Sequence, residues 1–129
     1  MGKGDEIILK HYKKVAKSFG KGPHSSMQDQ FIREKEIEFF CGEIERFREL
    51  KKKLPKVLDV GCGNGHLLEK LEERFVDCEF GGVEFTPELF NLAKERGLKR
   101  TFLKLGDCRQ EGFWEGNPDI IITERVIIN

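Results

Sequence analysis

The sequence predicts an α/β protein: a parallel β-sheet with flanking helices, preceded by N-terminal helices. Two observations predict this class. From residue 54 onward, short runs rich in Val, Ile and Leu alternate with segments whose apolar residues recur at helical spacing. The first run, in "VLDVGCGNGHLLEKL", passes through a glycine turn directly into such a segment. Strands that alternate with helices pair in parallel through right-handed crossovers.

The N-terminal segment, residues 1–53, is expected to be helical. In its first part Ile8, Tyr12, Val15 and Phe19 follow one another at spacings of four, three and four. A break rich in glycine follows, and a second helix is expected from the candidate N-cap Ser26 to the lysines at 51–53. Its apolar stripe consists of Ile37, Phe40, Cys41, Ile44, Phe47 and Leu50.

Four strands are expected in the remainder, 54–129, at about 57–60, 78–84, 101–105 and 120–123. The first is short and apolar, as a strand buried on both faces would be. Thr86 and Pro87 predict the N-cap and first residue of the helix after the second strand, and Gly97 predicts its C-terminus.

Composition predicts one globular domain. A chain of 129 residues is long enough for a single buried core, and its 23 basic and 23 acidic side chains cancel. No apolar run reaches the roughly 18 residues of a membrane helix, and no hydrophobic signal segment follows the start. We therefore expect a cytoplasmic protein without a membrane partner, and nucleic acid is disfavoured.

The four cysteines, Cys41, Cys62, Cys78 and Cys108, form no C-x-x-C pair. Neither a metal site nor a disulfide framework is predicted, and we expect free, mostly buried thiols. Cys62 stands in the glycine loop, where a thiol has two interpretations: a functional group, or a small side chain that fills space under the loop.

The glycine loop indicates a nucleotide, because a tight turn between strand and helix brings backbone N–H groups close to a ligand. A P-loop is excluded, since no G-K-[ST] follows. The dinucleotide pattern G-x-G-x-x-G would need glycine at position 66, where this chain has His66. This disfavours an NAD-linked oxidoreductase, which remains an alternative.

The run from Asp59 to Gly65, "DVGCGNG", resembles the D-x-G-x-G-x-G motif of class I S-adenosylmethionine-dependent methyltransferases. The resemblance implies a Rossmann-like sheet of strand order 3-2-1-4-5-7-6 and S-adenosylmethionine as cofactor. Strands five to seven have no counterpart here, so we expect a sheet truncated after the fourth strand.

The resemblance also implies a cofactor site at the carboxyl ends of the strands. Glu84, 21 residues after Gly63, matches an acid that binds both ribose hydroxyls, and a carboxylate can accept two such hydrogen bonds. Asp107 matches the acid that reads the adenine amino group. Ordinary helix or turn caps are the alternative interpretation of both acids. The implied cofactor-binding residues are Asp59, Gly61, Cys62, Gly63, Gly65, Glu84, Phe85, Asp107, Cys108 and Thr123.

By the same resemblance, 1–53 is expected to be a lid or cap and 54–129 the cofactor-binding core, within one domain overall. The candidates for catalysis are His11, Tyr12, His24 and Arg125. A lone surface histidine is more often simply solvated, and Tyr12 falls on the apolar face of its helix.

The methyl acceptor is expected to be a small molecule or a protein. "TERV", from Thr123, departs from the Asn-Pro-Pro-Tyr or Asp-Pro-Pro-Tyr of DNA amino-methylating relatives. A fourth strand at the sheet edge would need a cover: a second copy, a complementary chain, or further strands of a longer protein. A fragment or truncated product of a longer methyltransferase is the favoured expectation. A non-catalytic binding or regulatory half that works with a second chain is a further alternative.

Overall fold

The computed structural model describes residues 27–123 of the chain. Its elements are α2 (Met27–Lys51), β1 (Lys56–Val60), α3 (His66–Arg74), β2 (Glu79–Glu84), α4 (Pro87–Glu95), β3 (Thr101–Leu105) and β4 (Ile120–Thr123). The four strands begin and end within one residue of the predicted positions. The helix expected around residues 8–19 lies outside the described residues.

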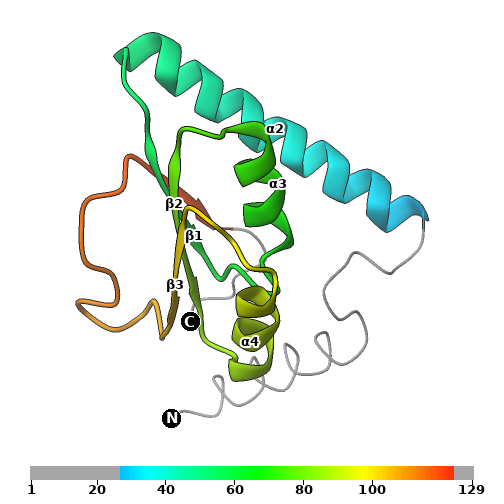
Figure 1. Ribbon diagram of the computed structural model, residues 1–129, viewed down its shortest axis with the longest axis vertical. Helices are drawn as coiled ribbons and strands as arrows, with labels where there is room; N and C mark the ends of the chain where they lie inside the picture. Colours follow the sequence, from blue (N-terminus) through cyan, green and yellow to red (C-terminus); the bar gives the residue numbers. More distant parts are fainter. Residues whose placement is uncertain (1–26, 124–129) are drawn as a thin grey trace.

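The four strands form one parallel sheet of order β3-β2-β1-β4 (Figure 1). β1 lies between β2 and β4, and all of its residues except Lys56 are buried. The predicted α/β class is therefore confirmed. Because every strand runs in the same direction, all four carboxyl ends, and the loops that follow them, lie at the same edge of the sheet.

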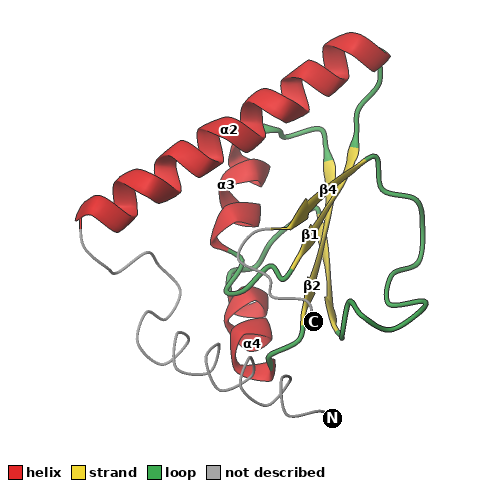
Figure 2. Cartoon of the chain, turned by 180° about the vertical axis from the view of Figure 1, so that it is seen from behind, coloured by secondary structure: helices red, strands yellow, loops and turns green. Residues whose placement is uncertain are grey.

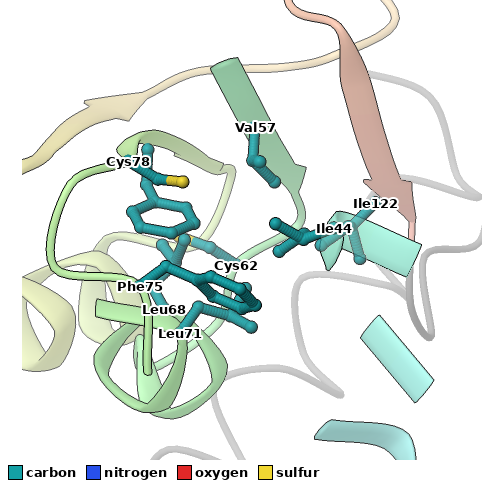
Figure 3. Packing of buried hydrophobic residues seen from close by; sticks show 9 residues of the cluster. Ile44, Val57, Cys62, Leu68, Leu71, Phe75, Cys78 and Ile122 are labelled. Carbon is teal, nitrogen blue, oxygen red and sulfur yellow. The ribbon is translucent and has the colours of Figure 1, made fainter. Parts of the chain in front are cut away.

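Of the described helices, α2, α3 and α4 all lie on one face of the sheet, and the long connection 106–119 lies on the opposite side (Figures 1 and 2). Ile44 of α2 is fully buried in the helix-side core (Figure 3). α2 thus packs on the same core as the strands. This cluster consists of Ile44, Val57, Cys62, Leu68, Leu71, Phe75, Cys78, Phe80 and Ile122.

The apolar stripe predicted for α2 is shorter than expected. Phe40 and Cys41 pack partly against the core beside Ile44, but Leu50 is 69% exposed. Leu50 lies in the last turn of the helix, beyond the residues that contact the core. Its apolar side chain therefore faces solvent. No helix within residues 27–123 is both long and apolar enough to cross a membrane.

The second face of the sheet has a smaller core, on which none of the described helices packs (Figure 2). Leu58, Val60 and Val83 pack there against three side chains of the long connection, Cys108, Phe113 and Trp114. A β-carbon at Gly81 would lie 2.4 Å from the Trp114 ring. Gly81 is therefore needed where the indole lies directly on the sheet.

The residues predicted to begin and end α4 lie where they were expected, but the Thr86 side chain does not cap the helix. Gly97 follows the helix with a φ of 66°, the left-handed conformation that glycine tolerates best. Thr86 is the N-cap residue, but its hydroxyl makes no capping hydrogen bond. The Thr86 N–H instead donates to the Glu84 carboxylate, 2.8 Å away. Thr86 thereby holds the acid at the end of β2.

Candidate functional site

The candidate site lies at the carboxyl edge of the sheet, where the four strand ends meet. Gly61 and Cys62 leave β1 and donate their N–H groups to the Val83 carbonyl, at 2.7 and 3.0 Å. Gly106 N–H donates to the Glu84 carbonyl at 2.9 Å. These bonds join the beginnings of two loops to the end of β2.

The glycine loop follows β1 and leads into α3. Its three glycines, Gly61, Gly63 and Gly65, have φ values of 76°, 59° and 82°, which other residues rarely adopt. Their surroundings differ. A β-carbon at Gly65 would lie 3.1 Å from the Ala93 side chain, whereas one at Gly63 would meet nothing within 4 Å. Gly65 thus permits close packing on α4, and Gly63 presents open backbone.

Glu84 lies against this loop. Its side chain is buried, and Oε1 accepts the Gly63 N–H at 2.8 Å while Oε2 accepts the Thr86 N–H. Burial raises the pKa of Glu84 above its usual value, and the N–H bonds from Thr86 and Gly63 oppose that rise. The Phe85 N–H also lowers the pKa of this carboxylate, and a carboxylate has about four acceptor positions in all.

Asp107 and Phe85 are linked by an arginine that sequence reasoning missed. Arg109 Nε and Nη2 bind the two Asp107 oxygens at 2.9 and 2.8 Å, and the Arg109 N–H donates to Oδ1 at 2.9 Å. The guanidinium carbon also lies 5.8 Å from the centre of the Phe85 ring. The arginine two positions after an acid in "GDCRQ" was the available signal.

The other predicted cofactor-binding residues lie at different depths. Asp59 is buried in β1. Cys62 belongs to the helix-side core, and burial raises the pKa of its thiol well above the usual value. Cys108 packs against the core on the opposite face. Thr123 is exposed at the end of β4 and pairs in register with Val60.

A second missed residue is Arg96, at the end of α4. Its side chain is only 6% exposed, Nε donates to the Asn64 carbonyl of the glycine loop at 2.6 Å, and Nη1 bonds Glu69 of α3 at 3.1 Å. Arg96 therefore ties the loop to two helices. The position just before the capping Gly97 gives no hint of this, because the partners lie about 30 residues away.

His66 opens α3 directly after the loop, and its N–H donates to Asn64 Oδ1 at 3.0 Å. Burial lowers the pKa of His66 to about 4, and the positive charges of Arg96, Lys70 and Arg33 act in the same direction. Its imidazole is consequently neutral at physiological pH. The side chain lines a groove between α2 and α3.

The catalytic candidates, His11, Tyr12, His24 and Arg125, lie outside the described residues. The four cysteines are free, as expected; two are buried and two are half-buried. Among residues 27–123, no three His, Cys, Asp or Glu side chains gather in a way that could hold a metal ion.

A family model described as a methyltransferase domain matches residues 51–129, more than half of the chain. The chain belongs to this methyltransferase family. The resemblance to class I S-adenosylmethionine-dependent methyltransferases is thereby confirmed, and the strand order β3-β2-β1-β4 agrees with the first part of the order that it implies.

Curated relatives of this methyltransferase domain include trans-aconitate 2-methyltransferases. That of Mycobacterium tuberculosis (strain ATCC 25177 / H37Ra) is 35% identical over 74 residues, which are 57% of this chain and 25% of the relative. That of Rhodococcus jostii (strain RHA1) is 34% identical over 74 residues, with 57% and 26% covered. The chain thus spans about a quarter of the length of these relatives.

Solved structures share the fold of the domain. The plantazolicin methyltransferase BpumL, in complex with S-adenosylhomocysteine (SAH), aligns with a TM-score of 0.59 at 20% identity, over 91% of this chain and 50% of that one. The amino pentose methyltransferase CalS10 of Micromonospora echinaspora aligns with a TM-score of 0.57 at 24% identity, over 80% and 43%.

Proposed function

We propose that this chain binds S-adenosylmethionine at the carboxyl edge of its sheet and serves methyl transfer to a small-molecule or protein acceptor. The observation that carries the proposal is the contact between the buried Glu84 carboxylate and the N–H group of Gly63. This contact supports the proposal, because a carboxylate that could accept a diol lies beside open backbone. The cofactor's chemistry is a methyl group bound to a sulfonium, which an aligned nucleophile can displace.

The residues at this edge fit the ribose and amino-acid parts of such a cofactor. The Glu84 oxygens accept the Gly63 and Thr86 N–H groups, and a carboxylate can accept further hydrogen bonds, which the two ribose hydroxyls would donate. The open space at Gly63 lets a ligand approach the backbone, whereas any side chain there would occupy it. Gly61 and Gly65 shape the loop, and Asp59 is buried in β1, two residues before Gly61.

For the adenine ring, we propose Phe85 and Asp107. Phe85 offers a flat, half-buried face, and the Asp107 carboxylate suits an exocyclic amino donor. Cys108 and Thr123 complete the proposed site at its margins.

We propose that the methyl-acceptor site and any general base involve segments other than the strand ends described above. We propose residues 1–53 as a cap over a core of 54–129, with His11, Tyr12, His24 and Arg125 as the candidates for contact with cofactor or acceptor. Among acceptors we favour a small carboxylic acid, in line with the trans-aconitate named for the curated relatives. Its carboxylate oxygen would attack the methyl carbon as the sulfonium sulfur leaves, so this acceptor would need no proton removed.

We also propose that a second copy of the chain covers the outer edge of β4. Within the described residues β4 pairs only with β1, and Ile121 on it is 58% exposed. Open strand edges beside apolar side chains favour strand-to-strand association.

The first test is calorimetric titration of the chain with SAH, with NADH as the comparison ligand. We expect selective binding of SAH. Glu84→Ala should weaken it by about 2–3 kcal/mol, which is roughly 30- to 150-fold, because both hydroxyls lose their acceptor. Glu79→Ala is the matched control, since Glu79 is exposed at the opposite end of the same strand.

Unchanged SAH affinity in a folded Glu84→Ala variant would contradict the ribose assignment. Preferential binding of NADH would instead favour the oxidoreductase alternative. The chain alone could bind SAH yet fail to transfer a methyl group from S-adenosylmethionine to trans-aconitate. If transfer then appeared after a complementary chain was added, the chain would be the non-catalytic half of a two-chain enzyme.

A further inference from the structure

The proposed function assigns the adenine ring to Phe85 and Asp107. The guanidinium of Arg109 contacts both of these side chains. Two of its nitrogens bind the two Asp107 oxygens side by side, at 2.9 and 2.8 Å. Such a paired arrangement is the strongest that arginine makes with a carboxylate. The backbone N–H of Arg109 adds a third bond to Oδ1, so the acid is heavily occupied.

The same guanidinium also lies over Phe85, with 5.8 Å between its carbon and the ring centre. A planar cation is attracted by the face of an aromatic ring at this separation. The Arg109 and Asp107 side chains are 25% and 18% exposed, so the pair is partly shielded from water. Shielding makes the contact more persistent than an open surface pair would be.

An adenine ring would need the same two surfaces. Its amino group is a donor for the Asp107 carboxylate, and its flat face would pack on Phe85. Arg109 offers the same features, since its N–H groups donate to Asp107 and its flat guanidinium lies over Phe85. Adenine and Arg109 therefore cannot occupy Asp107 and Phe85 at the same time.

We infer that Arg109 occupies the adenine position in the free chain and that cofactor binding displaces it. This inference rests on the proposed function. It adds that Arg109 lowers cofactor affinity, because its guanidinium competes with adenine for Asp107 and Phe85. Removal of Arg109 should therefore strengthen binding. An arginine that instead stacks on bound adenine would have the opposite effect, so the sign of the change decides between the two.

The test compares Arg109→Ala with the wild-type chain for two ligands, SAH and 5′-methylthioadenosine. 5′-Methylthioadenosine has adenine and ribose but lacks the charged amino-acid part of SAH. Loss of the Arg109 charge therefore cannot change its affinity through an attraction to a ligand carboxylate. We expect both to bind Arg109→Ala about two- to fivefold more tightly, the range set by a partly exposed ion pair. Arg46→Ala, on α2 with a 69% exposed side chain, removes the same charge elsewhere and should change neither affinity.

Two further measurements keep the inference testable if Arg109→Ala folds poorly. Arg109→Lys retains the charge but not the paired geometry, so its affinity should lie between those of the wild type and Arg109→Ala. Added salt should tighten 5′-methylthioadenosine binding to the wild type by weakening the Asp107–Arg109 pair, and should not do so for Arg109→Ala.

Equal or weaker binding by a folded Arg109→Ala, with the wild type binding SAH, would overturn the role of Arg109 and leave the proposed function standing. Failure of both chains to bind either ligand would contradict the cofactor site itself, and the role of Arg109 with it. Binding by Arg109→Ala alone would be the strongest support.

Discussion

At the scale of single residues, Gly63 and Gly97 share a backbone conformation but differ in position. Their φ values are 59° and 66°, and a β-carbon at either would meet nothing within 4 Å. Gly63 stands in the glycine loop against Glu84, whereas Gly97 follows the end of α4. Substitutions at the two glycines therefore distinguish two effects: the loss of stability from a strained backbone, and the loss of affinity from a side chain that blocks the ligand.

We expect Gly63→Ala and Gly97→Ala to lower the free energy of unfolding by a similar amount, about 1 kcal/mol, because alanine disfavours positive φ. Only Gly63→Ala should also weaken SAH binding, by at least about tenfold, since its methyl group would stand where ligand meets backbone. Chemical denaturation and calorimetry measure the two effects. Equal SAH affinities would show that the space at Gly63 is not used by the cofactor.

At the scale of elements, Glu72 joins α3 to the turn before β3. Its carboxylate accepts the N–H groups of Lys99 and Arg100 at 3.0 and 2.8 Å, and also the Thr101 hydroxyl. Burial raises the pKa of Glu72, but the bonds from Thr101 and the two N–H groups outweigh it, so the pKa lies below its usual value. The ionised acid thus stabilises the fold above about pH 4.5, and this contribution is lost as pH falls through the lowered pKa.

Glu72→Ala should lower the free energy of unfolding at neutral pH by about 2–4 kcal/mol, because it leaves three partly buried donors without their acceptor. Glu73→Ala, the neighbouring exposed acid on the same helix, should change it by less than about 0.5 kcal/mol. Urea denaturation at pH 7 tests both. Similar stabilities of the two variants would mean that water replaces the Glu72 carboxylate at this junction.

At the scale of the whole molecule, the two faces of the sheet are unequally covered. Helices bury one face. On the other face the cross-strand row runs Phe102, Gly81, Leu58 and Ile121, and within the described residues Trp114 lies against Gly81 and also meets the Phe102 ring, with 5.7 Å between the ring centres. At the ends of this row Phe102 is 68% exposed and Ile121 is 58% exposed. Ile121 also lies on β4, which among the described strands pairs with β1 alone, so an apolar side chain and an open strand edge occur together in this part of the chain.

We therefore expect the chain to self-associate as concentration rises, and Ile121→Lys to weaken this association by at least about tenfold, because it places a charge on the exposed apolar row. Val76→Lys is the control, since Val76 is an apolar residue outside the sheet whose side chain is also exposed, to 70%. Sedimentation velocity over a range of concentrations measures the effect. A chain that stays monomeric throughout would contradict the second copy as the cover of β4.

The sequence by itself determined the order and extent of the strands, the helices after β1 and β2, and the glycine loop with its family. These are local properties, since apolar periodicity and turn residues act over a few neighbours. It also predicted that Glu84 and Asp107 would lie at the same edge, because parallel strands place their carboxyl ends together.

Only the tertiary structure decided which groups touch. Glu84 bonds the Gly63 N–H across 21 residues of sequence, Arg96 reaches the loop from α4, and Arg109 joins Asp107 to Phe85. It likewise decided that Leu50 is exposed although its spacing is that of a core residue. Periodicity states which face a side chain is on, but packing between distant segments determines whether anything covers that face and which donor meets which acceptor.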